Sequence, residues 1–127
     1  MSAITTHVLD TALGRPAAGV PVRLERADGH EQPDPHNAWG AEEAALVAGA
    51  LGEGTTDADG RVRELGPERI TAGRYRLVFD TASYFQKTGQ RGFFPEVVLT
   101  FRVEDPAQHY HVPLLLSPFA YSTYRGS

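Results

Sequence analysis

Short runs in which apolar and polar residues alternate, separated by turn signals, constrain this chain to β structure. The runs lie at about 3–10, 20–25, 74–79, 97–104 and 109–117. Alternation with a period of two gives a strand one apolar face and one polar face. Turns are predicted at Gly14-Arg15-Pro16, at the DADG sequence of residues 57–60, at Gly73 and at Asp105-Pro106. This pattern predicts an all-β, two-sheet sandwich of seven or eight short strands.

One short helix is expected within this β framework. Asp80 or Thr81 can cap a helix that extends to about Thr88. Gly89 can end it. A chain of 127 residues predicts a single domain, here residues 1–127.

Residues 28–50 are the stretch with the weakest pattern. Prolines, glycines and polar residues predict an extended loop over 28–43, followed by a strand within 44–56. The Ala, Glu and Leu content of 41–51 favours a competing interpretation, a short helix at 41–48.

Pro21, within the run at 20–25, predicts either an edge strand or an N–H position that needs no partner.

Composition excludes several classes of function. The net charge is -4 and no basic run is present, so neither nucleic acid nor an anionic membrane is an expected partner. The chain has no cysteine, which excludes disulfides. No signal peptide or apolar stretch of about 20 residues is visible, so a cytoplasmic location is expected.

The segment from His109 to Ser127, HYHVPLLLSPFAYSTYRGS, carries an unusual combination of residues. Alternation places His109 and His111 on one face of a strand, with Tyr110, Val112 and Leu114 on the other. An apolar strand, a Ser-Pro turn and an aromatic strand follow, and the sequence then reads Tyr-Arg-Gly-Ser. Two imidazoles on one strand face, close to this tetrapeptide, mark a candidate site.

The sequence resembles the 5-hydroxyisourate hydrolases, the transthyretin-like enzymes of purine catabolism. The resemblance rests on ITTHVLDTALGRPAAGVPVRLER, TTDADGRV, GRYRLVFDTASYFQ, FFPEVVLTF, HYHVPLLLSP and the YRGS tetrapeptide, in order and spacing. It covers nearly the whole chain except about residues 28–50, where this chain is longer than is usual in the family. It implies the transthyretin (prealbumin-like) fold and a homotetramer, a dimer of dimers, with sites in the channel between subunits.

The resemblance also implies an activity and a set of site residues. The activity is hydrolysis of 5-hydroxyisourate to 2-oxo-4-hydroxy-4-carboxy-5-ureidoimidazoline in urate degradation, without a cofactor or metal. His7, Arg61 and His111 match the catalytic trio of the family, and Ser127 is expected to join them. Tyr124, Arg125 and Gly126 are expected to bind the substrate, and His109 to have a structural or supporting role.

These residue types suit the hydrolysis of a cyclic amide. Such a reaction needs an activated water, a proton for the departing nitrogen and positive charge for the oxyanion. Two histidines can divide the base and orienting roles, because neutral imidazole accepts a proton near pH 7. The arginine fork suits a flat, oxygen-rich ring. Gly126 permits close backbone approach, and which histidine is the primary base stays open.

Three other functions compete with that of the hydrolase. A small-molecule carrier would use the same channel, as transthyretin does, but would favour apolar or neutral residues over imidazoles and a guanidinium. A zinc hydrolase would use His7, His109 and His111 as ligands. An interaction module with a dead site has no support in the sequence. The 28–50 segment could cover the site, alter a tetramer edge or hang free, and its His30 and His36 are interpreted as solvated loop residues.

Overall fold

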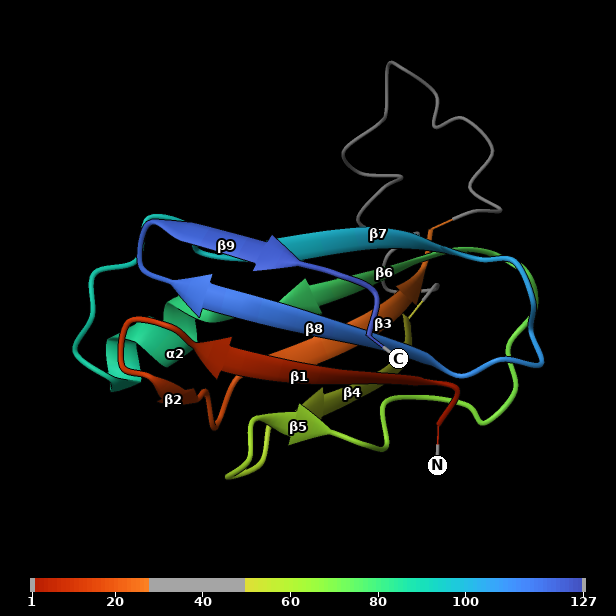
Figure 1. The fold of residues 1–127 in the computed structure, drawn as a ribbon, viewed down its shortest axis with the longest axis horizontal. Helices are drawn as coiled ribbons and strands as arrows, with labels where there is room; N and C mark the ends of the chain where they lie inside the picture. The colour runs from red at the N-terminus through yellow and green to blue at the C-terminus, as the bar shows by residue number, and fades with distance from the viewer. Residues whose placement is uncertain (1, 28–49, 127) are drawn as a thin grey trace, which may run out of the picture.

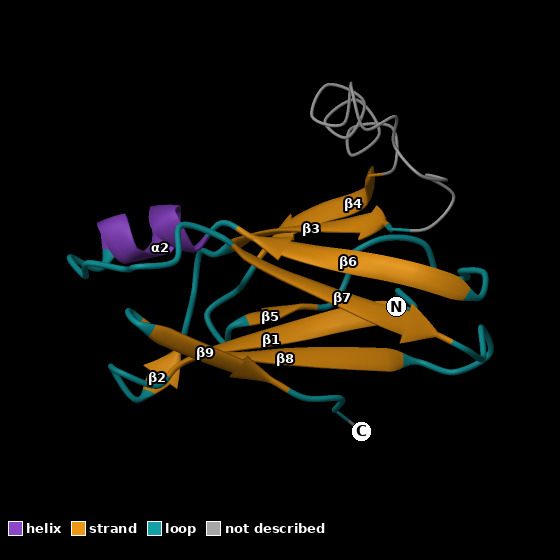
Figure 2. Ribbon diagram, turned by 90° about the horizontal axis from the view of Figure 1, so that it is seen from above, coloured by secondary structure: helices purple, strands orange, loops and turns teal. Residues whose placement is uncertain are grey.

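The structure, a computed structural model, describes residues 2–27 and 50–126 and shows two β-sheets packed face to face (Figure 1, Figure 2). The five-stranded sheet contains β1 (Ile4–Asp10), β2 (Arg15–Pro16), β5 (Arg61–Val62), β8 (Tyr110–Ser117) and β9 (Ala120–Thr123). The four-stranded sheet contains β3 (Pro21–Arg26), β4 (Ala50–Thr55), β6 (Gly73–Phe79) and β7 (Val97–Val103). A short helix, α2 (Thr81–Lys87), follows β6. The prediction of a two-sheet sandwich with one short helix is confirmed for this part of the chain.

Strand order brings distant parts of the sequence together. The five-stranded sheet runs β2-β1-β8-β9, with β5 pairing on β1, and the four-stranded sheet runs β4-β3-β6-β7. The pairing of β1 with β8 is parallel, from Ile4 opposite Tyr110 to Asp10 opposite Leu116. The N-terminal and C-terminal motifs therefore lie side by side in the middle of one sheet.

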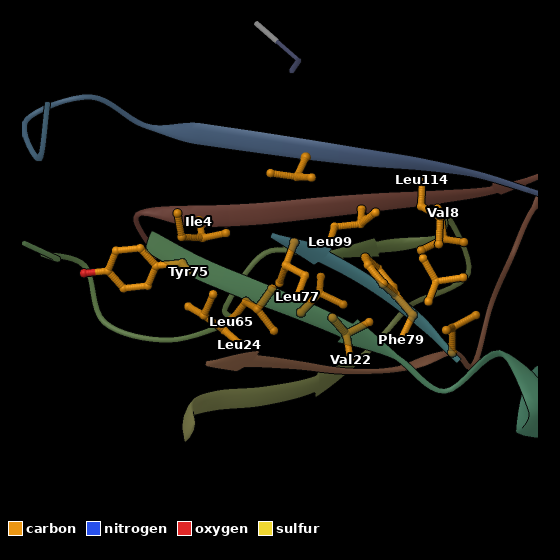
Figure 3. Packing of buried hydrophobic residues seen from close by; sticks show 14 of the residues in the cluster. Ile4, Val8, Val22, Leu24, Leu65, Tyr75, Leu77, Phe79, Leu99 and Leu114 are labelled. Carbon is orange, nitrogen blue, oxygen red and sulfur yellow. The ribbon is translucent and has the colours of Figure 1, made fainter. Parts of the chain in front are cut away.

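The inward faces of the two sheets form the hydrophobic core (Figure 3). The five-stranded sheet contributes Ile4, Val8 and Leu114, and the four-stranded sheet contributes Leu77 and Phe79, all five of them fully buried. Each such side chain stabilises the fold by about 1.5–3 kcal/mol relative to exposure. Because inward positions are apolar, the polar residues that alternate with them lie on the outward faces.

The helix forms as its sequence predicts, and a hydrogen bond connects it to the end of β1. Asp80 is the N-cap, since its Oδ1 accepts the Ser83 N–H at 3.1 Å, and Thr88 is the C-cap. Gly89 follows with φ +68°, a left-handed conformation that suits glycine. The Tyr84 hydroxyl donates to Asp10 Oδ2 at 2.6 Å, which ties the helix to the end of β1.

One local prediction was wrong, and of the two alternatives for Pro21 the edge strand was wrong, whereas an N–H position that needs no partner agrees with the structure. Arg15 and Pro16 form β2 rather than part of a turn, because they pair with Asp10 and Leu9; the turn itself contains Gly14, at φ +70°. Pro21 begins β3, which lies between β4 and β6 and is not an edge strand. The first position of a strand tolerates proline, because its missing N–H interrupts no ladder.

The stretch with the weakest pattern lies mostly outside the described residues. The strand expected within 44–56 is present as β4 over Ala50–Thr55. The extended loop and the competing helix at 41–48, together with His30 and His36, fall outside the residues that the structure describes. Within the described ranges, no helix is long and apolar enough to cross a bilayer. The cytoplasmic location stays a prediction.

Candidate active site

Two histidines lie close together on the outward face of the five-stranded sheet. His7 is on β1 and His111 on β8, and their ring centroids are 6.5 Å apart, with an angle of 35° between the ring planes. The parallel register places His111 opposite Thr5 and His7 opposite Pro113. Both imidazoles are half-buried. The strand pairing thus assembles a histidine pair from residues that are over 100 positions apart.

A turn places Arg61 beside this pair. Arg61 begins β5 and lies directly opposite His7 in the antiparallel pairing with β1. The Asp57 carboxylate orders the preceding turn, because its Oδ1 accepts the Asp59 N–H at 2.9 Å and the Arg61 N–H at 3.0 Å. The hydrogen bond from Arg61 is the main cause that lowers the pKa of Asp57.

Gly60 completes this turn. Its φ is +78°, and a Cβ added there would lie 2.3 Å from the Val8 carbonyl oxygen. Only glycine fits this conformation and this close approach without a shift of the backbone. The DADG turn therefore determines the position at which Arg61 begins β5, opposite His7.

The same turn fixes the protonation of one ring nitrogen of His7. His7 Nε2 lies 2.9 Å from the Asp59 carbonyl oxygen. A carbonyl oxygen only accepts, so Nε2 carries a hydrogen and donates it. In the neutral ring the unprotonated nitrogen is then Nδ1, which is available as an acceptor toward a ligand.

His111 is held in a different environment. Burial lowers its pKa, and the charges of Arg61, His7 and His109 lower it further. His111 is therefore more strongly biased toward the neutral form at pH 7 than a free imidazole. Its Nδ1 lies 2.9 Å from the Thr5 hydroxyl, so Nε2 is the ring nitrogen that remains for chemistry.

The C-terminal tetrapeptide reaches this site through Gly126. After β9 the chain turns back across β8 (Figure 1), and the Gly126 N–H donates to the His111 carbonyl oxygen at 2.8 Å. A Cβ at Gly126 would lie 2.7 Å from His111 Cδ2. The close approach that the sequence suggested for this glycine is thus made to the imidazole itself. Ser127 lies outside the described residues.

Tyr124 and Arg125 lie on the β7 side of His111. The Arg125 guanidinium stacks 4.7 Å from the centre of the Tyr110 ring and donates to Gln108 Oε1 at 2.8 Å. Tyr124 is 58% exposed. Both residues, with His111 and Tyr110, line a cavity of about 320 Å³ between β7 and the β8–β9 pair. The structure thus brings together His7, Arg61, His111 and Gly126, whereas Arg125 contacts Gln108 and Tyr110.

The zinc alternative is not favoured by this geometry. His109 and His111 do share one face, as the alternation predicted, but both contact the Thr5 hydroxyl: His109 Nε2 and His111 Nδ1 each lie 2.9 Å from Thr5 Oγ1. Among the described residues, no group of three or more His, Cys, Asp or Glu side chains is arranged to hold a metal ion.

Thr5 and Asp57 are the two site residues that the sequence reasoning missed. Thr5 lies two positions before His7, so the period-two alternation already placed both on one face. That spacing was the available signal. For Asp57 the signal was its place at the first position of the turn before Arg61, where Asp side chains commonly accept backbone N–H groups.

A sandwich with this strand order and a His–Arg constellation on one outward sheet face defines a transthyretin-like protein. Residues 4–126 match the model of the HIUase/Transthyretin family, and the chain belongs to that family.

Comparison with individual proteins gives the same result. The chain is 44% identical to a 5-hydroxyisourate hydrolase from Caulobacter vibrioides over 131 residues, covering 100% of both proteins. Its fold is similar to that of the Klebsiella pneumoniae 5-hydroxyisourate hydrolase, with a TM-score of 0.75, 31% identity and 98% of each chain covered. It is also similar to transthyretin from Sparus aurata, with a TM-score of 0.79, 26% identity and coverage of 99% and 97%.

Proposed function

We propose that this protein hydrolyses 5-hydroxyisourate to 2-oxo-4-hydroxy-4-carboxy-5-ureidoimidazoline in urate degradation. The observation that carries the proposal is the constellation of His7, Arg61 and a half-buried His111 with a lowered pKa, at one point on the sheet. The full-length similarity to proteins named 5-hydroxyisourate hydrolase supports the choice of substrate.

The reaction begins with the histidine pair binding a water molecule. Neutral His111 accepts a proton through Nε2 as the water oxygen attacks a ring carbonyl carbon. The tetrahedral intermediate then collapses, the carbon–nitrogen bond breaks, and the proton passes from the imidazolium to the departing nitrogen. One water is consumed: its hydroxyl becomes part of the new carboxyl group, and its proton becomes part of the terminal NH2 of the new ureido group.

The remaining residues bind and orient the substrate. The Arg61 guanidinium holds substrate oxygens and stabilises the developing oxyanion. His7 orients the water or the ring through Nδ1, since its Nε2 donates to the Asp59 carbonyl. Tyr124, Arg125 and Gly126 bind the substrate, and Ser127 contributes a hydroxyl to the reaction.

The fold alone does not distinguish this function from that of a carrier, because the similarity to a transthyretin is as high as to a hydrolase. The composition of the outward sheet face favours the enzyme. Two imidazoles and a guanidinium lie where a carrier of an aromatic molecule gains most from apolar or neutral side chains. Among the described residues, each histidine uses one ring nitrogen in a hydrogen bond, and the other nitrogen suits proton transfer.

Assembly into a homotetramer belongs to the same proposal. The strands β7 and β9 end their sheets on the same side of the sandwich (Figure 2). Large hydrophobic residues near these edges are exposed: Phe93 69%, Val98 40%, Phe119 73% and Tyr121 39%. Unpaired strand edges with apolar neighbours favour association. Replacing Val98 by Lys is expected to give smaller species in size-exclusion chromatography with reduced activity, and a monomer with full activity would contradict the tetramer requirement.

The decisive assay uses substrate made in place. Urate and urate oxidase generate 5-hydroxyisourate, and its absorbance decay is followed with and without the protein, because the compound also decays unaided. Wild-type protein is expected to accelerate the decay, and His111→Ala to abolish the acceleration while keeping its size-exclusion profile. No acceleration by well-folded wild-type protein would favour the carrier, tested next by equilibrium binding of a small aromatic ligand.

A further inference from the structure

The Thr5 hydroxyl lies between two histidines that face the site. Thr5 is on β1 opposite His111, its residue is 7% exposed, and its Oγ1 lies 2.9 Å from both His109 Nε2 and His111 Nδ1. His109 itself is exposed. A nearly buried hydroxyl therefore connects an exposed imidazole to the imidazole proposed to act on water.

Because the Thr5 hydroxyl has a single proton, the tautomer of His109 and the tautomer of His111 depend on each other. A threonine hydroxyl has one proton to donate and can accept through its lone pairs. It cannot donate to both histidines, so one ring nitrogen must donate to it. When both rings are neutral and the Thr5 proton is used in one of the two contacts, two arrangements satisfy both contacts. In the first, His111 Nδ1–H donates to Thr5 and Thr5 donates to His109 Nε2. In the second, His109 Nε2–H donates to Thr5 and Thr5 donates to His111 Nδ1.

The two arrangements give His111 opposite chemical properties. In the first, its Nε2 has a free lone pair and can take a proton. In the second, Nε2 carries a hydrogen and His111 cannot act as a base. Burial and the nearby positive charge of Arg61 lower the pKa of His111 and favour its neutral form. Of the two arrangements, only the first leaves this neutral ring able to act as a base.

We propose that Thr5 is a positioning residue: by donating to His109 Nε2 and accepting from His111 Nδ1–H, it holds neutral His111 with Nε2 as the free base. This inference rests on the proposed function only in naming His111 as the base. His109 has a defined role in it, because its unprotonated Nε2 accepts the Thr5 proton. The arrangement also persists when Nε2 is protonated, since His111 Nδ1–H still donates to Thr5.

The first test observes the proton directly, without substrate. Full-length protein labelled with ¹⁵N-histidine is examined by NMR at a pH where His111 is neutral, with His111→Gln used to assign the signals. The expected spectrum shows a protonated Nδ1 and an unprotonated Nε2 for His111. In Thr5→Val, which removes the hydroxyl and keeps the shape, the populations of the two forms are expected to change. A protonated Nε2 in the wild type would overturn the proposal.

The second test measures catalysis with a matched control. Thr5→Val is expected to lower kcat about 10- to 100-fold and to leave KM nearly unchanged, because the base is affected and not the substrate contacts. Thr5→Ser keeps the hydroxyl and is expected to restore most of kcat. Thr6→Val is the control, because Thr6 is fully buried on the inward face and its hydroxyl donates to the Val112 carbonyl at 2.6 Å. It removes a neighbouring hydroxyl without touching either histidine.

The outcomes separate this inference from the proposed function. A Thr5→Val protein with wild-type kcat, or a Thr5→Ser protein as impaired as Thr5→Val, would contradict the positioning role. A wild-type protein that shows the expected His111 tautomer but does not accelerate 5-hydroxyisourate decay would contradict the proposed substrate and leave the Thr5 arrangement intact.

Discussion

The polar residues on the two outward sheet faces of the sandwich have different kinds of partner. On the four-stranded sheet, Glu25 is fully buried and its carboxylate is held by arginines: Arg23 Nε donates to Oε2 at 2.5 Å and Arg76 Nε lies 4.0 Å from Oε1. On the five-stranded sheet, His7 and His111 contact neutral groups, a carbonyl oxygen and a hydroxyl. Within the part of the chain that the structure describes, one face pairs charges, and on the other each imidazole is bonded through one of its two nitrogens.

The difference shows why charge and cavity size are poor guides to the site. A cavity of about 490 Å³ on the four-stranded sheet, lined by Arg23, Glu53, Asp80 and Glu96, is larger than the cavity of about 320 Å³ that reaches His111. The Glu25 carboxylate is fully buried and paired with Arg23, so it contributes to the fold and is not accessible to a ligand. An imidazole bonded through one nitrogen is oriented by that bond and keeps the other nitrogen for a ligand.

Removing the arginine of the five-stranded face should have the largest effect. Arg61→Ala is expected to lower kcat/KM for 5-hydroxyisourate by about 10²–10³, because an oxyanion donor is lost. The matched control is Arg63→Ala, two residues further on. The Arg63 side chain is 59% exposed, and its guanidinium lies 3.8 Å from the Asp57 carboxylate. This exposed pair is worth little, so activity should stay within about twofold of the wild type. Equal losses in both variants would mean that Arg61 acts only through the turn.

Breaking the ion pairs of the other face should affect stability and not catalysis. Glu25→Ala leaves Arg23 and Arg76 without their carboxylate, and urea unfolding is expected to show a loss of about 2 kcal/mol. This is below the roughly 3–5 kcal/mol of a fully buried pair, because the Arg23 side chain is 40% exposed. The kcat of the folded fraction should not change. A large fall in kcat at full stability would mean that the two faces are coupled.

The sequence predicted which residues of a strand share a face better than it predicted which strands pair with each other. Period-two alternation predicted an alternating strand at 74–79, where Leu77 and Phe79 are buried in the structure, and one shared face for His109 and His111, which both contact Thr5. It could do so because alternation is a local property of a strand. Pairing is not local. The parallel contact of β1 with β8 joins residues about 106 positions apart and alone brings Thr5 to His111. For the same reason the interior position of β3 was missed, since Pro21 carries no information about which strands flank it.

Loosening the turn that positions Arg61 should have a smaller effect on activity than removing Arg61. Asp57→Ala removes the acceptor of the Asp59 and Arg61 N–H groups. The Asp59 carbonyl and the Arg61 side chain then lose their fixed positions at His7, and kcat/KM is expected to fall about tenfold, since small displacements of catalytic groups are costly. Asp57→Asn, which keeps one acceptor oxygen, should recover part of the loss. Unchanged activity in Asp57→Ala would show that strand pairing alone positions Arg61.

The smallest expected effect is that acid abolishes activity at a higher pH than the pH at which it unfolds the protein. The lowered pKa of His111 means that kcat/KM should fall on the acid side with a midpoint below 6.5, the ordinary value for histidine, because the base must be neutral. Folding should also become slightly less favourable below pH 6.5, since the unfolded chain binds this proton more readily.

Asp10 contributes at lower pH. Its burial raises the carboxyl pKa, but hydrogen bonds from Tyr84, Leu13, Gln90 and Ala12 outweigh this, and the pKa is lower than 3.8. Its contribution to stability is therefore present above pH 3.8 and is lost as the pH falls through the lower folded value. Parallel measurements of kcat/KM and of circular dichroism from pH 8 to pH 3 should show activity lost first, while the sandwich is still folded. Coincident loss of activity and structure would mean that acid inactivates the protein by unfolding it and not by protonating His111.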